Sequence, residues 1–208
     1  YIPVTNDLLK DSDEDIEAII IEWLANESRV TRNNNILNII KAKEQTDLKN
    51  LDGIKRAVTV TLGSAYRKNS LIVTNDDGIN YLDTLKDSTG RYLLSQDPKN
   101  TDDFVLKCGT VSLKVRTYSN ETIQSNGTKV PFFIGDFKEA IKLFDREQLS
   151  LMASNTAVVG TGDDTLNAYE QDLTIIRGLD RLDVKKRDED AFVNGYIDLA
   201  SANQAIVG

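Results

Sequence analysis

The sequence predicts a mixed α+β chain, in which a long helix is followed by mixed helices and strands and then by returning strands. Three patterns lead to this prediction. Between Ile16 and Ile40, apolar residues recur at spacings of three and four, which is the pattern of one helix face. In residues 111–115, Val and Leu alternate with Ser and Lys, as in a strand covered on one side. Residues 173–184 form a β-rich stretch that predicts one long strand, bent near Gly178.

The composition excludes several classes of protein. Apolar residues make up 40% and charged residues 28% of the 208 positions, which is typical of a globular chain with one large domain or two small ones. The longest apolar run, residues 18–21, is far shorter than the ~20 residues of a membrane-spanning helix, so no membrane segment is expected. With a net charge of −8, the chain would on average be repelled by nucleic acid, so direct or sequence-specific binding is disfavoured.

The chain contains no histidine, and Cys108 is its only cysteine. Nucleophile systems that depend on histidine and the common zinc sites are therefore excluded, and no internal disulfide can form. We expect no catalytic, cofactor-binding or metal-binding residue in this chain, and no cofactor. Cys108 is expected to be buried and inert, and both counts are typical of a chain folded in the cytoplasm.

Local signals predict three helices. The long helix should begin within residues 11–14, where Asp or Ser can cap a helix and acidic side chains suit its first turn. A second helix is expected over residues 47–60, because four apolar residues fall on one face in spite of Gly53. A third should follow the strand at residues 70–74, with Asn75 as its cap.

Turn residues divide the rest of the chain. Polar turn chemistry predicts breaks at residues 87–90, 97–100 and 160–164. Asn126-Gly127 predicts a hairpin, and a strand containing Pro131 should follow over residues 130–134. Residues 140–144 and 149–153 flank a polar turn at 145–148 and are expected to form an antiparallel pair. A short helical turn is expected at residues 188–193.

Acidic residues gather at Asp76-Asp77, Asp163-Asp164 and Asp188-Glu189-Asp190. Carboxylate oxygens can hold magnesium or calcium, so a cation-dependent hydrolase is one alternative function. None of the clusters has the spacing of a calcium loop, and acidic runs are usually solvated turns or helix starts. No metal site is predicted. Gly160-Thr161-Gly162 begins like a dinucleotide fingerprint, but Thr165 stands where the third glycine belongs.

Several segments resemble the major capsid proteins of tailed phages with the Hong Kong 97 phage-type fold. The most specific is Val73-Thr74-Asn75-Asp76-Asp77-Gly78, followed by LDTLKDSTGRYLL at residues 82–94. In that family a strand ending in Asn precedes a helix, which leads into a loop like Leu85 to Arg91 here. The other similar segments, in the family's order, are residues 2–25 at the entry to the spine helix, 134–154 and 187–199.

The resemblance implies two domains interleaved along the chain. Residues 1–60, with the spine helix, and the returning strands at residues 138–187 would form a peripheral domain. Residues 61–137 and a closing segment at residues 188–208 would form an axial domain of mixed helices and sheet. The family's amino-terminal arm and extended two-stranded loop have no counterpart before the spine helix, and because residue 1 is Tyr and the only Met is Met152, we expect a trimmed piece of a longer polypeptide.

The resemblance implies a structural function without catalysis. Copies of the chain would assemble into pentamers and hexamers of an icosahedral shell around the DNA genome, in the virion of a bacteriophage or prophage, after assembly in the bacterial cytoplasm. In the full-length protein, a scaffolding segment, a maturation protease and a portal are implied as further partners. A monomeric binding module is the second alternative function, and it would expose one apolar patch instead of several interface strips.

Overall fold

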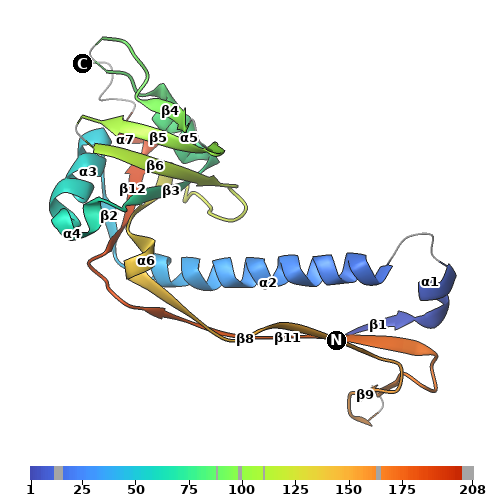
Figure 1. The fold of residues 1–208 in the computed structure, drawn as a ribbon. Coiled ribbons are helices and arrows are strands. Elements are labelled where there is room, and N and C mark those ends of the chain that lie inside the picture. The colour runs from blue at the N-terminus through green and yellow to red at the C-terminus, as the bar shows by residue number, and fades with distance from the viewer. Residues whose placement is uncertain (12–15, 88, 98–99, 110, 163–164, 203–208) are drawn as a thin grey trace. The chain divides into compact units, whose positions relative to one another are not determined.

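The structure, a computed structural model, describes residues 1–11, 16–87, 89–97, 100–109, 111–162 and 165–202 (Figure 1). The chain folds into two compact units. Unit 1 comprises Tyr1–Ile36 and Leu143–Val184, and unit 2 comprises Leu37–Lys142 and Lys185–Gly208. The predicted α+β class is confirmed, and the two units are interleaved along the chain. The first division, after Ile36, comes earlier than the domain boundary expected after Val60.

Unit 1 combines a long helix with long strands. Strand β11 lies between β1 and β8 in a three-stranded sheet, and β9 pairs with β10 in a separate ribbon. Helix α2 begins within unit 1 and confirms the predicted long helix. Of the residues expected to cap it, Asp11 ends α1 instead, and residues 12–14 lie outside the described residues. The elements are β1 (Ile2–Thr5), α1 (Asn6–Asp11), α2 (Ile16–Lys41), β8 (Ile141–Ser154), β9 (Val158–Val159), β10 (Leu166–Asn167) and β11 (Leu173–Lys186).

Strand β8 corrects one prediction. The polar residues 145–148 do not form a turn between two short strands, because Ile141–Ser154 is one continuous strand. Its backbone pairs with the neighbouring β11, which confirms the predicted long strand. Polar side chains suit the middle of β8 because the strand has little cover: residues 142–146 are all exposed. The polar pattern correctly indicated that these residues are exposed to solvent. They are exposed because β8 is an edge strand of its sheet, and not because they form a turn.

Unit 2 is built on a seven-stranded sheet with the order β2-β12-β7-β3-β6-β5-β4. Strand β3 runs parallel to β6 and antiparallel to β7, and the edge strand β2 runs parallel to β12. The strands are β2 (Gln45–Asp47), β3 (Leu71–Asn75), β4 (Leu94–Asp97), β5 (Asn100–Cys108), β6 (Val111–Tyr118), β7 (Lys129–Gly135) and β12 (Phe192–Asp198). The helices are α3 (Leu51–Arg56), the π-helical η1 (Ala57–Thr61), α4 (Gly63–Arg67), α5 (Asp76–Thr84), α6 (Phe137–Ala140) and α7 (Leu199–Ala202).

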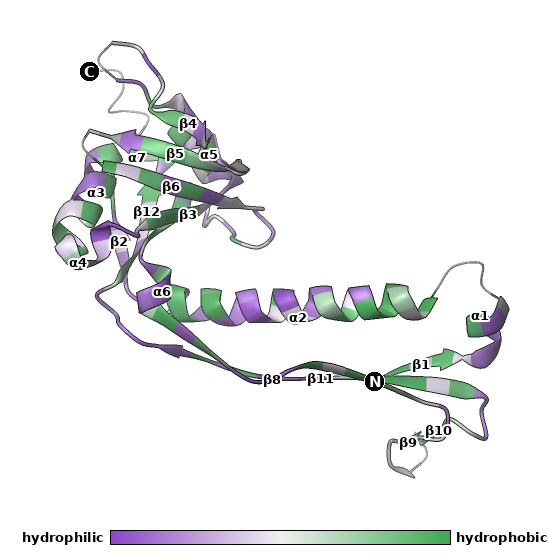
Figure 2. Ribbon diagram, viewed as in Figure 1, coloured by the Kyte–Doolittle hydropathy of each residue, from purple (hydrophilic) through white to green (hydrophobic). Residues whose placement is uncertain are grey.

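The main core of unit 2 lies between one face of this sheet and the helices α3, η1 and α5. Strand β7, in the interior of the sheet, carries buried apolar residues in succession, because both of its faces are covered. Phe132 and Ile134 point into the main core with Ile72 of β3, whereas Phe133 is buried on the other face. Figure 2 shows apolar residues along the strands of this sheet. Strand β6 confirms the predicted strand at residues 111–115.

The second predicted helix is present, but its start was predicted wrongly. Residues 45–47 form strand β2, and the Leu48 amide still donates to the carbonyl of Tyr196 at 2.9 Å. Helix α3 begins only at Leu51, after Asn50, whose Oδ1 accepts from the amide of Gly53 at 3.2 Å. The pairing of β2 with β12, far along the chain, outweighs the local helical pattern at its start.

Gly53 has a steric role. A Cβ at this position would lie 1.7 Å from the carbonyl oxygen of Leu48 and 2.6 Å from its carbonyl carbon. The loop between β2 and α3 therefore turns back so closely that only glycine fits, which explains a glycine inside a helix where alanine is otherwise preferred.

We expect Gly53→Ala to lower the free energy of unfolding by about 2 kcal/mol, because backbone must move to relieve the overlap. Urea denaturation followed by circular dichroism measures this change. Gly178→Ala is the control, since a Cβ there would lie 3.5 Å from Leu151, an ordinary contact distance. Equal losses in the two variants would contradict the steric account.

Other local predictions have mixed outcomes. The unit of strand, Asn75 cap and helix is confirmed in β3 and α5. Asn126-Gly127 forms the predicted tight turn, in which Asn126 and Lys129 pair as an antiparallel bridge, but this turn does not join neighbouring strands of the sheet, because β3 lies between β6 and β7. The helical turn expected at residues 188–193 is wrong, since strand β12 begins at Phe192.

The turns predicted at 87–90, 97–100 and 160–164 lie partly outside the described residues. Within the described part of the chain, no helix has the length and apolar character needed to cross a membrane.

Candidate functional site

The first acidic cluster, Asp76-Asp77, lies in the first turn of α5 and closes a loop. Asp77 accepts hydrogen bonds from Ser125 Oγ at 2.6 Å and from Asn120 Nδ2 at 3.3 Å, and Asp76 accepts from the Asn120 amide at 3.1 Å. Carboxylates in a first helical turn also interact favourably with the helix dipole. Both carboxylates are therefore used to hold the loop after β6 against the start of α5, as the reading of a helix start predicted.

Asn75 is the centre of this junction and is fully buried. Its Oδ1 accepts from the Gly78 amide at 3.0 Å, while its Nδ2 donates to the carbonyl of Ile123 at 2.9 Å and to Ser125 Oγ at 2.7 Å. One side chain thus caps α5 and binds the loop that carries Ile123 and Ser125. The motif at residues 73–78 builds a folding junction, with its polar groups bound to backbone and side-chain groups of the loop after β6.

The second cluster, residues 188–190, forms a turn before β12. Asp188 accepts hydrogen bonds from the Tyr66 hydroxyl and from the amide of Asp190, at 2.9 Å for the amide. The hydrogen bond from Tyr66 lowers the pKa of Asp188. Glu189 accepts from Lys186 at 2.7 Å, which lowers the pKa of Glu189. The carboxylates of Asp188 and Glu189 therefore bind different partners instead of converging on one point.

Tyr66→Phe is expected to destabilise the chain at pH 7 and to lose this effect in acid. The pKa of Asp188 lies below its ordinary value of 3.8 in the folded chain, so the contribution of the hydrogen bond is present above that pH and is lost as the pH falls through the lowered pKa. Thermal melting at pH 7 and at successively lower pH measures the difference. Tyr118→Phe, at a partly exposed tyrosine of the same unit, is the control. A deficit that stays constant down to acid unfolding would contradict the assignment.

Lys43 fastens the end of α2 to the same turn within unit 2. Its Nζ donates to the carbonyls of Glu189 at 2.5 Å and Phe192 at 2.6 Å and lies 4.8 Å from the centre of the Phe192 ring. Burial lowers the pKa of Lys43. Asn194, fully buried in β12, donates to the carbonyl of Lys43 at 2.7 Å. These contacts fix the carboxyl end of the long helix and engage the ammonium group of Lys43.

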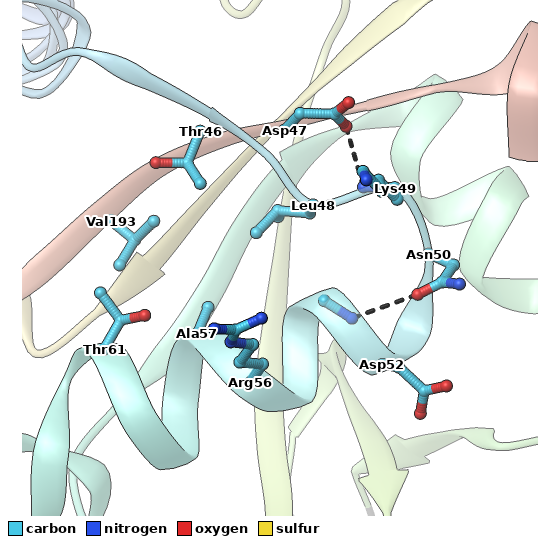
Figure 3. A pocket seen from close by; sticks show the side chains of 11 residues that line it. Thr46, Asp47, Leu48, Lys49, Asn50, Asp52, Arg56, Ala57, Thr61 and Val193 are labelled. Atoms are coloured by element: carbon cyan, nitrogen blue, oxygen red, sulfur yellow. Dashed lines mark hydrogen bonds between the residues drawn. The ribbon is translucent and has the colours of Figure 1, made fainter.

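A pocket of about 540 Å³ lies beside the turn from β2 into α3 (Figure 3). Leu48, Ala57 and Val193 supply its apolar lining, and the charged residues on its rim are of both signs. Its polar groups stabilise the local fold. The carboxylate of Asp47 accepts a hydrogen bond from the amide of Lys49 at 2.9 Å, and Oδ1 of Asn50 accepts one from the amide of Gly53 in the first turn of α3. The pocket therefore presents a helix cap and a turn, with no pair of groups placed for acid and base catalysis.

The remaining site predictions concern metals, the glycine loop and the cysteine. Among the residues that the structure describes, no group of three or more Cys, Asp or Glu side chains could hold a metal ion. Asp163-Asp164 lie outside the described residues. Gly160 and Gly162 have positive φ angles of 106° and 71°, which fits the predicted loop. Cys108 ends β5 opposite Val111, and the prediction of its burial stays a prediction.

Large apolar side chains are exposed on both units, mostly on unit 1. Exposed apolar surface of this kind marks sites of protein association when it is extensive. Unit 2 contributes Val60, Tyr92 and Tyr118. Unit 1 contributes Tyr1, Leu8, Ile19, Ile21, Trp23, Val30, Leu143, Phe144, Met152, Val158 and Tyr169. The exposed apolar side chains of unit 1 are therefore stronger candidates for a functional site than the pocket beside α3.

Comparisons with solved structures show the same fold. The capsid of an empty GTA particle computed with C5 symmetry matches with a TM-score of 0.68 and 15% identity, over 94% of this chain and 71% of that chain. A chain from Mycobacterium phage Adephagia matches with a TM-score of 0.61 and 12% identity, over 95% and 70%. One from Microbacterium phage Oxtober96 matches with a TM-score of 0.66 and 15% identity, over 93% and 69%.

Sequence comparison gives the family. Among curated proteins, no sequence matches this chain. The model of the phage capsid family matches residues 1–196, which is nearly the whole chain. The resemblance drawn from the motif at residues 73–78 and from the later segments is thereby confirmed. The chain belongs to the phage capsid family, as a structural, major capsid protein of a virion and not an enzyme.

Proposed function

We propose that copies of this chain form pentamers and hexamers that close into an icosahedral shell around a DNA genome. The observation that carries the proposal is the match of the capsid family to residues 1–196 of a chain that has the corresponding fold. Two of the similar structures are capsids of GTA particles computed with C5 symmetry, one empty and one native. A ring of five copies is one of the two rings that the proposal requires.

We further propose that unit 1 is the peripheral domain and unit 2 the axial domain. The interleaving of the two units along the chain supports this assignment, since the resemblance implies the same alternation. The boundaries then follow the compact units and fall after Ile36, Lys142 and Val184. Residues 37–60, which the resemblance placed in the peripheral part, would belong to the axial domain, because Leu48, Ile54 and Val58 are part of its core.

The distribution of exposed side chains supports assembly through unit 1. Trp23 and Met152 are 53% and 65% exposed, and large apolar side chains at such exposure are costly for a monomer in water. A closed shell gives each copy several neighbours related by symmetry, so contacts can be spread over many modest strips. In the full-length protein, a scaffolding segment, a maturation protease and a portal would be further partners, with assembly in the bacterial cytoplasm.

Electron microscopy of the expressed full-length protein tests the proposal. Closed particles, or rings of five and six copies, are the expected result, and sedimentation should show a species far larger than the monomer. Assembly should be tried over a range of salt and protein concentrations, because contacts between partly charged surfaces depend on ionic strength. Monomers alone under all of these conditions, with the circular dichroism of a folded chain, would count against a shell-forming subunit.

A further inference from the structure

Within unit 1, Arg32 of α2 contacts carboxylates on two different strands. Its Nη1 lies 3.2 Å from Asp145 Oδ2 of β8, and its Nη2 lies 3.1 Å from Asp180 Oδ1 of β11. One helical turn earlier, Ser28 Oγ donates to Asp180 Oδ2 at 2.5 Å. Residues four apart share a helix face, so a single face of α2 makes all of these contacts. The side chains of Arg32 and Asp180 are only 27% and 16% exposed.

The same part of α2 is otherwise lightly packed. Among the side chains described between Ile16 and Ile36, none is buried. On the strand side, the methyl groups of Leu24 lie 3.7 Å from the position of a Cβ on Gly178. Ile19, Trp23 and Val30 point away from the strands, at helical positions opposite Ser28, and all three are exposed. Figure 2 shows apolar and polar residues mixed along the helix.

Because residues 16–36 of α2 bury little apolar surface, the charged contacts of Arg32 contribute a large share of what holds this segment to the strands. A helix of a globular domain is normally held by the burial of an apolar stripe. Here that burial is slight, whereas hydrogen bonds between charged groups are about twice as strong as neutral ones. The hydrogen bond from Ser28 and the guanidinium of Arg32 lower the pKa of Asp180, so this carboxylate stays ionised at neutral pH.

We propose that Arg32 is a latch that holds residues 16–36 of α2 against β8 and β11, and that this segment separates from the strands as one piece when the latch opens. Unit 2 stays folded, because it has its own core. Salt weakens the latch, since its charges are only partly shielded from solvent. The inference goes beyond the proposed function, because it concerns an opening of the single subunit and does not require assembly.

Hydrogen exchange of the 208-residue chain, followed by mass spectrometry, tests the latch. In Arg32→Met, amides of residues 16–36 are expected to exchange at least about tenfold faster than in the unmodified chain, as the loss of charged hydrogen bonds predicts. Peptides from β7 and β12 should be unchanged. Arg29→Met is the matched control, since Arg29 lies on the same helix and its Nη2 donates to Asn26 of that helix at 3.3 Å instead of to a strand. Asp180→Asn should reproduce the effect of Arg32→Met.

Salt dependence separates a latch from a general loss of stability. In the unmodified chain, added sodium chloride should accelerate exchange in residues 16–36, and in Arg32→Met it should have little further effect. Equal exchange in Arg32→Met and Arg29→Met would overturn the proposal. Faster exchange in β7 and β12 along with α2 would also overturn it, because the segment would then not open separately. An unmodified chain whose exchange does not respond to salt would contradict the electrostatic basis.

Discussion

Asn75→Ala is expected to lower the free energy of unfolding by about 3 kcal/mol, because three hydrogen bonds are lost at a fully buried side chain. The carbonyl of Ile123 would be left without its donor, and α5 would lose its cap. Burial makes this loss larger than that of an ordinary cap, since water cannot easily replace the missing groups. Chemical denaturation followed by circular dichroism gives the difference directly.

Asn50→Ala is the matched control for this prediction. Asn50 caps α3 through the same kind of contact, from its Oδ1 to the amide of Gly53, but it is exposed. Removal of an exposed cap costs about 1 kcal/mol. If the two alanine variants were destabilised equally, the claim that Asn75 joins the loop at Ile123 to α5 would fail, and the residue would be an ordinary helix cap.

Phe132→Ala is expected to lower the free energy of unfolding by about 4 kcal/mol, more than any of the other substitutions. The side chain of Phe132 is fully buried on β7, an interior strand of unit 2, and its ring meets that of Tyr81 edge-on with a centroid distance of 6.3 Å. A cavity in the middle of the sheet cannot collapse without moving the paired strands. Thermal and urea unfolding both report the change.

Tyr92→Ala provides the comparison for Phe132, since Tyr92 is 60% exposed and its ring contacts Lys86 at the surface. The expected loss of unfolding free energy is at most about 1 kcal/mol, the upper value for an exposed cation–π pair. A small effect of Phe132→Ala, close to that of Tyr92→Ala, would mean that unit 2 does not derive its stability from the core around β7.

Local signals in the sequence predicted the parts of the fold that depend on neighbouring residues. Asn75 could be predicted as a helix cap because a cap acts locally. The amide from which its side chain accepts a hydrogen bond belongs to Gly78, only three residues further along the chain. Helix α2 and strand β11 were found from their periodicity. Non-local contacts explain the errors. Strand β1 pairs with Leu173–Ile176 at the other end of the chain, and β2 pairs with β12, so neither strand has a local pattern that would identify it.

The functional surfaces were predictable only in part. The resemblance at residues 73–78 led to the capsid family, and the structure shows that these residues build a folding junction. The polar residues 145–148 predict a turn, yet Asp145 is one of the two carboxylates that bind Arg32. Side chains on β8, β11 and α2 meet only in the folded chain, and no spacing within one segment predicts such a meeting.

The central claim is that the chain is a shell subunit whose unit 2 surrounds the symmetry axes of its rings. A cryo-electron microscopy reconstruction of particles formed by the full-length protein tests this most directly. The account predicts closed particles in which the seven-stranded sheet of unit 2 lies next to five-fold and six-fold axes, with unit 1 further out. Particles with unit 1 at these axes, or a protein that forms no symmetric ring, would contradict it.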